Sequence, residues 1–103
     1  MTTKPTETDV RVVFIRRENG PERLVCDAEL MFGDGPLAGM KLVGFCLWNG
    51  ADGETYATFP SRAFGGSTER RYFDYLRSVE GTPAESSRLK AWIVEQWRLS
   101  LAA

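Results

Sequence analysis

Residues 23–32, with the sequence RLVCDAELMF, carry an apolar side chain at every second position. The apolar set that shares one face consists of Leu24, Cys26, Ala28, Leu30 and Phe32. Asp27 and Glu29 lie on the opposite face. A period of two with one polar face is typical of an antiparallel strand that is buried on one side only. This segment therefore predicts a half-buried strand inside a sheet.

Further strand sequences lie on both sides of this segment, separated by turn sequences. In chain order, the expected strands are residues 10–16, 23–32, 40–48 and 55–59. Asn19-Gly20 predicts a tight hairpin turn between the first two, because both residue types tolerate a positive φ. Residues 33–39 hold three glycines and a proline, and residues 49–53 are rich in glycine, so both are expected to be turns. Such short connections predict a meander of sequential antiparallel strands.

The end of the chain predicts a helix from about residue 84 to residue 99. Thr82-Pro83-Ala84-Glu85 has the form of a capping box with proline at the first helical position. A stripe at helical spacing follows, made of Leu89, Trp92, Ile93, Gln96 and Trp97. The sheet is the available partner for this stripe. The expected fold is therefore α+β, a four- to five-stranded antiparallel meander with one C-terminal helix packed on it.

The chain has 103 residues, enough for one domain, which we place at residues 9–101 after a flexible tail of residues 1–8. Residues 61–67 are expected to be an irregular loop, and residues 71–76 a short strand or extended segment. The first and third strands carry apolar residues on both faces, whereas one helix covers one face. This mismatch suggests that a second copy covers the other face, as in a homodimer.

Composition argues against several functions. The chain has no histidine, which removes Ser-His-Asp and Cys-His nucleophiles and His-ligated metal sites. Cys26 and Cys46 are too far apart for a Cys-x-x-Cys motif, and two free thiols are the simpler interpretation. We expect no catalytic residues, no metal and no cofactor. The longest uncharged run, residues 42–51, is too short to cross a bilayer, and residues 1–7 lack an apolar signal core, so we expect a cytoplasmic protein without membrane contact.

Positive charge gathers in the second part of the chain. The net charge is −3 over residues 1–60, with six basic and nine acidic residues, and +2 over residues 61–103, with seven basic and five acidic ones. Four arginines, Arg62, Arg70, Arg71 and Arg77, interleave with Tyr72, Phe73 and Tyr75. Arginine forks for phosphates and aromatic faces for bases are typical of nucleic-acid surfaces. The alternative is that these arginines solvate a loop while the aromatic residues pack under the helix.

Other features have simpler structural interpretations. The glycines of residues 33–39 precede a strand, not the helix that a phosphate-binding loop needs. Asp27 and Glu29 fit a solvated strand face better than a pair of catalytic carboxylates. Trp92 and Trp97 fit core or dimer contacts better than a base-stacking platform.

Two segments together resemble the SpoVG (stage V sporulation protein G) family. They are Phe45-Cys46-Leu47-Trp48-Asn49-Gly50-Ala51-Asp52-Gly53 and Tyr56-Ala57-Thr58-Phe59-Pro60-Ser61-Arg62. Together they resemble the family's apolar strand, glycine-containing turn and strand that ends in apolar-Pro-Ser-Lys/Arg. Tyr72-Phe73-Asp74 and the helix pattern from Arg88 to Trp97 are similar to later family features.

The resemblance covers roughly residues 9–97. It implies a small bacterial cytoplasmic dimer, a regulator of septation and gene expression that binds DNA or RNA. It also implies that the Pro60-Ser61-Arg62 corner and the basic segment after it contact the phosphate backbone. The expected nucleic-acid-binding residues are Ser61, Arg62, Arg70 and Arg71. Because the whole chain is slightly acidic, a protein-interaction module of the same fold without nucleic-acid binding is the alternative.

Overall fold

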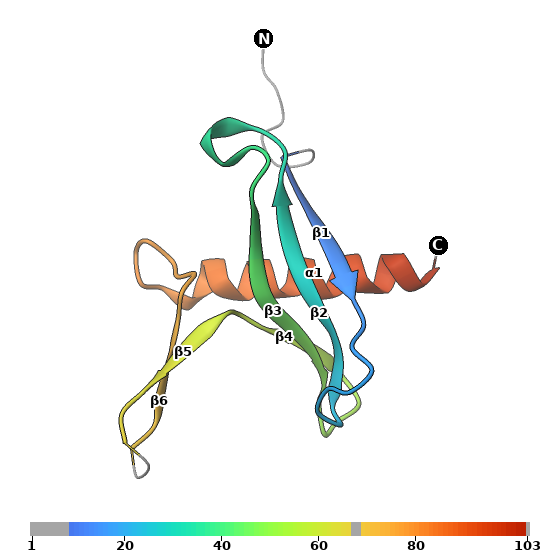
Figure 1. Ribbon diagram of the computed structural model, residues 1–103, viewed down its shortest axis with the longest axis vertical. Helices are drawn as coiled ribbons and strands as arrows, with labels where there is room; N and C mark the ends of the chain where they lie inside the picture. Colours follow the sequence, from blue (N-terminus) through green and yellow to red (C-terminus); the bar gives the residue numbers. More distant parts are fainter. Residues whose placement is uncertain (1–8, 67–68, 103) are drawn as a thin grey trace.

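The computed structural model describes residues 9–66 and 69–102 (Figure 1). The strands are β1 (Val10–Ile15), β2 (Leu24–Phe32), β3 (Lys41–Asn49), β4 (Thr55–Thr58), β5 (Ser61–Phe64) and β6 (Arg71–Asp74). A 3-10 turn, η1 (Gly35–Leu37), precedes β3, and the helix α1 (Pro83–Ala102) ends the fold. The expected flexible tail, residues 1–8, lies outside the described residues.

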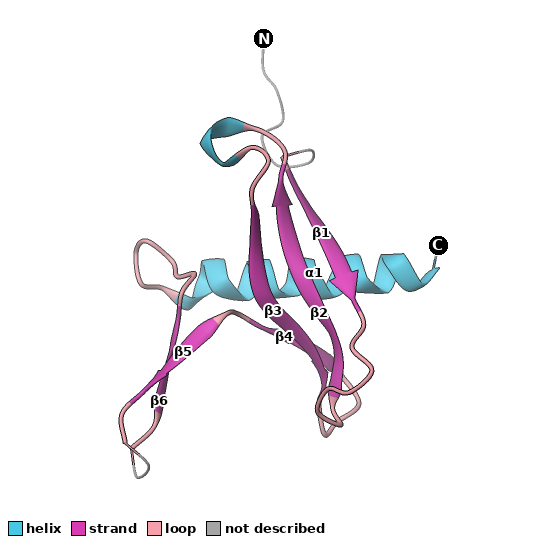
Figure 2. Cartoon of the chain, in the orientation of Figure 1, coloured by secondary structure: helices cyan, strands magenta, loops and turns pink. Residues whose placement is uncertain are grey.

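The first four strands form one antiparallel sheet in the order β1-β2-β3-β4. Helix α1 crosses one face of this sheet, as Figure 2 shows in cyan against magenta. The α+β class, the meander and the packed C-terminal helix are thereby confirmed. The helix is longer than the expected residues 84–99, since it begins at Pro83 and ends at Ala102. No helix in the described ranges is long and apolar enough to cross a membrane.

The core lies between the sheet and α1. Its buried residues are Cys26, Ala28, Leu30, Phe45, Leu47, Ala57, Phe59, Ile93 and Trp97. The core contains two edge-to-face ring pairs. The ring centres of Phe14 and Trp97 lie 5.2 Å apart, and those of Phe45 and Phe59 lie 5.4 Å apart. Such pairs stabilise a core beyond the area they bury. The expected helical stripe therefore faces the sheet as predicted, with Ile93 fully buried.

Strand β3 contains a bulge that strict alternation does not predict. Leu30 pairs with Leu42 and Ala28 pairs with Phe45, so one residue of β2 faces two of β3. The extra residue brings Leu42 to the same face as Phe45. Strict alternation would place these two side chains on opposite faces. Gly44 allows the bulge with its φ of 104°, and a Cβ there would lie 2.8 Å from the Pro60 Cβ.

The segment after Pro60 is a strand and not the irregular loop expected from the sequence. Residues 61–67 were expected to be an irregular loop, but Ser61–Phe64 is strand β5, paired antiparallel with β6. The alternation of Ser-Arg-Ala-Phe with Arg-Tyr-Phe-Asp around Gly65-Gly66 explains the hairpin, because glycine permits the reversal. The expected strand at residues 71–76 is confirmed over Arg71–Asp74.

The sheet face away from α1 is partly apolar. Val13, Ile15, Val43 and Tyr56 are exposed there. Two ion pairs cross the same face, Arg17 with Asp27 at 2.8 Å and Lys41 with Glu29 at 3.0 Å. The carboxylates of β2 therefore serve as partners for nearby cations. The homodimer inferred from this face stays a prediction.

Candidate nucleic-acid interface

The β5–β6 hairpin projects from the rest of the molecule, as its described residues 61–66 and 69–74 show (Figure 1). We call residues 61–74 the arm. We call β1–β4 with α1 the body. The amide of Tyr75 donates a hydrogen bond to the carbonyl oxygen of Pro60 at 2.9 Å, which closes the arm at its base. Pro60 also packs against Gly44 of the body, as described above. The arm thus leaves the sheet at a fixed point directly after β4.

The strand register assigns the side chains of the arm to two faces. Arg62 pairs with Phe73 and Phe64 pairs with Arg71, so these four side chains share one face, which we call the Arg/Phe face. The other face carries the remaining strand residues, Ser61, Ala63, Tyr72 and Asp74. Of the four predicted site residues, the structure therefore brings Arg62 and Arg71 together on one face. Ser61 lies on the other face, opposite the carboxylate of Asp74.

Contacts within the Arg/Phe face are local. The rings of Phe64 and Phe73 lie 5.2 Å apart in an edge-to-face arrangement, and the Arg62 guanidinium lies 4.8 Å from the Phe64 ring centre. Phe64 and Phe73 nevertheless remain 45% and 44% exposed. Both rings therefore have surface left for a ligand. The alternative, in which Tyr72, Phe73 and Tyr75 pack under the helix, is not met, because these side chains are 65%, 44% and 64% exposed.

The arginines of the arm are free of ion pairs within the described ranges. The salt bridges there are Arg17–Asp27, Lys41–Glu29 and Arg98–Glu95, all in the body. Arg62, Arg70 and Arg71 are all exposed. With Glu69 and Asp74 counted, three basic and two acidic residues give the arm a net charge of +1. An arginine without a carboxylate partner keeps its full set of donors for a phosphate.

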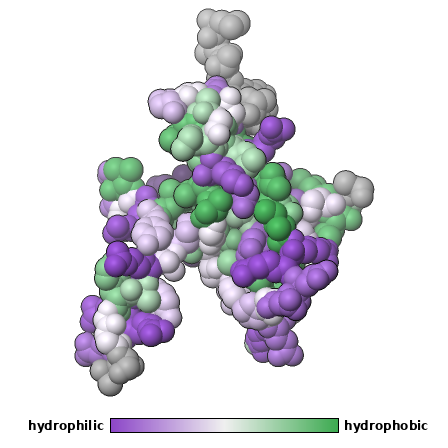
Figure 3. Space-filling model, in the orientation of Figure 1, coloured by the Kyte–Doolittle hydropathy of each residue, from purple (hydrophilic) through white to green (hydrophobic). Residues whose placement is uncertain are grey.

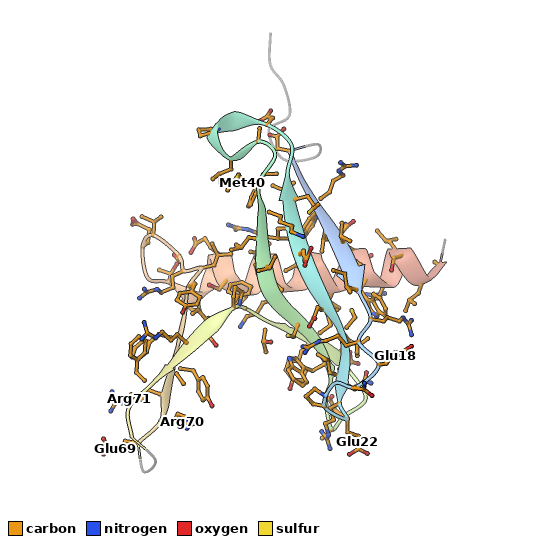
Figure 4. All side chains as sticks on the ribbon, viewed as in Figure 1. Glu18, Glu22, Met40, Glu69, Arg70 and Arg71 are labelled. Carbon is orange, nitrogen blue, oxygen red and sulfur yellow. The ribbon has the colours of Figure 1, made fainter. Side chains whose placement is uncertain are left out.

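Arg70 lies outside the two strands, near the far end of the arm. Figure 4 shows Arg70 and Arg71 on opposite sides of the hairpin, with Glu69 near the tip. Arg70 is therefore close to the Arg/Phe face along the chain but is not a member of it. It can contact a strand of nucleic acid that passes over the tip.

The turn of the arm depends on one glycine. Gly65 has a φ of 98°, a conformation that L side chains rarely adopt. A Cβ at this position would collide with the carbonyl oxygen of Glu69. The close approach of these two backbone segments sets the pairing that puts Arg71 beside Phe64.

The body offers no competing chemical centre among the described residues. They hold no group of three or more His, Cys, Asp or Glu side chains suited to a metal. Burial raises the pKa of the Cys26 thiol to about 11 and, together with Asp27, raises that of Cys46. Both thiols are thus protonated at neutral pH and are poor nucleophiles or ligands. Trp97 lies in the core, in agreement with its simpler interpretation.

An apolar groove of about 530 Å³ lies between the sheet and the first half of α1. Leu42, Leu76 and Trp92 contribute to its walls, and Glu85 and Arg88 are its charged residues. The arm differs from this groove, because the space-filling view in Figure 3 shows apolar and hydrophilic residues side by side on it. Cationic and aromatic side chains on one surface are typical of proteins that bind single-stranded nucleic acid.

Sequence reasoning found the arginines but missed Phe64 as their partner. The loop expected at residues 61–67 gave Phe64 no fixed neighbour. The alternation on both sides of Gly65-Gly66 was the signal that could have paired it with Arg71. No protein-family model, curated protein or solved structure matches this chain.

Proposed function

We propose that this protein is a small, non-enzymatic regulator that binds nucleic acid through its arm, as the resemblance to the SpoVG family implies. The observation that carries the proposal is a projecting hairpin whose exposed arginines form no ion pair with any described residue. Arg62 and Arg71 contact phosphates from the Arg/Phe face, and Arg70 contacts them from the tip. Ser61, at the base of the arm, contributes at most one hydrogen bond from its hydroxyl to the nucleic acid.

Charge distribution supports the arm over the body. The whole chain has a net charge of −1, while the arm carries +1. A phosphate strand is therefore attracted locally and repelled by the remainder of the surface. Binding of this kind is mainly electrostatic, so its affinity falls steeply with salt and depends little on sequence.

Fluorescence anisotropy with labelled DNA and RNA at about 50 and 200 mM salt tests the proposal. The double variant Arg62→Ala/Arg71→Ala is expected to lose most of the binding. The matched control is Arg11→Ala/Arg88→Ala, which removes the same charge from exposed positions of the body. Equal losses in the two variants would show that only net charge matters, and unchanged binding in the arm variant would refute the assignment.

A second candidate is a protein-interaction module, which the exposed apolar residues on the outer sheet face favour. Val43 and Tyr56 are 49% and 48% exposed, and Val13 and Ile15 lie on the same face. A homodimer through this face, in the cytoplasm, fits both candidates. Sedimentation of Val43→Asp tests it: a shift from dimer to monomer supports the face as the contact, and an unchanged dimer refutes it.

A further inference from the structure

We propose that the Arg/Phe face of the arm selects unpaired nucleotides, with bases stacked on Phe64 and Phe73 and the adjoining phosphates held by Arg62 and Arg71. This inference rests on the proposed function and adds which strand state and which face of the arm are involved. Unpaired DNA and unpaired RNA present the same phosphates and base faces, so both belong to this ligand class.

The arrangement of the four side chains favours alternating contacts. Each phenylalanine has an arginine directly across the hairpin, Phe73 opposite Arg62 and Phe64 opposite Arg71. Side chains at such positions lie about 5 Å apart across the strands, and neighbours on one strand face lie about 7 Å apart. Ring and guanidinium therefore alternate in both directions over a patch of two rings and two guanidiniums. A strand that crosses it meets a cation beside every ring.

The rings determine the preference for unpaired strands. In a duplex the base faces are stacked on one another, so a protein ring meets only groove edges. An unpaired strand offers free base faces, and stacking on an aromatic ring is favourable for every base type. The two strands of the arm contain no Asn or Gln, the side chains that pair with adenine edges. Because stacking is favourable for every base type, we expect selection by strand state with little selection by sequence.

The opposite face of the arm is less suitable for binding bases together with their phosphates. Its aromatic residue, Tyr72, is 65% exposed and thus more accessible than either phenylalanine. However, Asp74 offsets the charge of Arg70, which lies on this side of the hairpin, and the cross-strand partner Ala63 is neutral. This face therefore has no net positive charge, whereas the Arg/Phe face carries two arginines. A phosphate beside Tyr72 would have a carboxylate as its near neighbour on that face. Exposure alone would favour Tyr72 as the stacking residue, whereas the distribution of charge favours the Arg/Phe face.

The test compares full-length wild type with Phe64→Leu/Phe73→Leu, using a 20-nucleotide mixed-sequence DNA strand, the same sequence as RNA, and the matching DNA duplex. Leucine keeps an apolar side chain but has no ring. Wild type is expected to bind both single strands at least about tenfold more tightly than the duplex. The variant is expected to lose about 5- to 100-fold in single-strand affinity per stacked base, and little in duplex affinity.

Two controls separate a lost ring from a disturbed arm. Tyr72→Leu removes a more exposed ring from the opposite face and is expected to leave the preference intact. Phe64→Tyr/Phe73→Tyr keeps both rings in place and is expected to retain single-strand binding. If the tyrosine variant binds as poorly as the leucine variant, or if Tyr72→Leu has the larger effect, the Arg/Phe face is not the stacking surface and the inference is overturned.

The strand-state inference and the proposed function fail in different ways. Equal wild-type affinity for duplex and single strands, still lost in Arg62→Ala/Arg71→Ala, overturns the inference and leaves the proposed function standing. Absence of wild-type binding to all three probes at about 50 mM salt overturns the proposed function, and the inference with it. A preference for RNA over the DNA strand, or the reverse, would identify the source of the unpaired strand within the inference.

Discussion

The body and the arm are both made of antiparallel strands, yet they are stabilised differently. Every buried hydrophobic residue of the described chain belongs to the body or directly follows β4, whereas neither strand of the arm contains a buried residue. Burial of apolar surface stabilises the body. The arm depends on its backbone ladder, one ring pair and one glycine turn.

This difference separates stability from function along the chain. A buried residue in the body is constrained by its packing neighbours, so its side chain has little freedom to contact anything else. A two-stranded hairpin alone is marginally stable in water, and the arm is joined to the body near Pro60 and Tyr75. The side chains of its two strands are largely exposed and therefore available for a ligand. Changes in the body should affect folding, and changes in the arm should affect binding.

The largest expected effect is in the core. Ile93→Ala removes a fully buried side chain that packs between α1 and the sheet, and it should cost about 2–5 kcal/mol of unfolding free energy. Urea denaturation of the variant and the wild type measures this loss. Val79→Ala, at a position that is 99% exposed, is the control and should change stability by less than about 0.5 kcal/mol. A loss below about 1 kcal/mol for Ile93→Ala would contradict the assigned core.

The next effect is at the junction of body and arm. Gly44→Ala forces a side chain into a positive φ and against Pro60, and it should cost about 1–3 kcal/mol. Gly39→Ala is the matched control, because Gly39 also has a positive φ but a Cβ there would meet no atom within 4 Å. Urea midpoints of the two variants isolate the contact with Pro60. Equal losses would show that backbone strain alone acts at Gly44.

A smaller change in global stability is expected in the arm. Gly65→Ala should disrupt the turn, because its Cβ would collide with Glu69, but it should leave the urea midpoint of the body nearly unchanged. Amide hydrogen exchange measures the two regions separately: protection should fall within residues 61–74 and persist in β2 and β3. Loss of protection throughout the sheet would show that the arm is not separable from the body.

The smallest effect is a pH dependence at the start of α1. The Thr82 and Ser78 hydroxyls donate hydrogen bonds to the Glu85 carboxylate at 2.6 and 2.8 Å, which lowers the pKa of Glu85. A lowered folded-state pKa stabilises the protein above the unfolded-state value of about 4.3, and this contribution is lost as the pH falls through the lowered value. Glu85→Ala should therefore be slightly less stable than wild type at pH 7, with the gap closing below about pH 4. Thermal melts across this range measure the gap, and a gap that widens in acid would contradict the assignment.

The body was largely predictable from sequence because its signals are local and consistent. Alternation in residues 23–32 and the proline at the helix start each predicted an element that the structure contains. The tight turn predicted at Asn19-Gly20 was wrong, because neither residue has a positive φ and the connection between β1 and β2 spans residues 16–23. The bulge at Gly44 was not predictable from alternation, because it depends on how β3 fits both β2 and Pro60. It moved Leu42 to the core face.

The sequence predicted the arginines of the arm but not their arrangement on its faces. Arg62 and Arg71 were identified from charge and aromatic neighbours, but their common face depends on a hairpin whose first strand resembled a loop. Ser-Arg-Ala-Phe buries nothing, so it lacks the hydrophobic signal on which strand prediction mainly rests. Register alone separates Ser61 from the two arginines, and register is a property of the pair of strands.

The most direct test of the account replaces residues 61–74 with Asn-Gly, a turn that can join Pro60 to Tyr75, which already share a backbone hydrogen bond. Single-strand binding by anisotropy and unfolding by urea are then measured on the same protein. The account predicts a body with a nearly unchanged urea midpoint and no measurable binding at about 50 mM salt. Retained binding would show that the arm is not the nucleic-acid interface, and an unfolded product would show that the body depends on it.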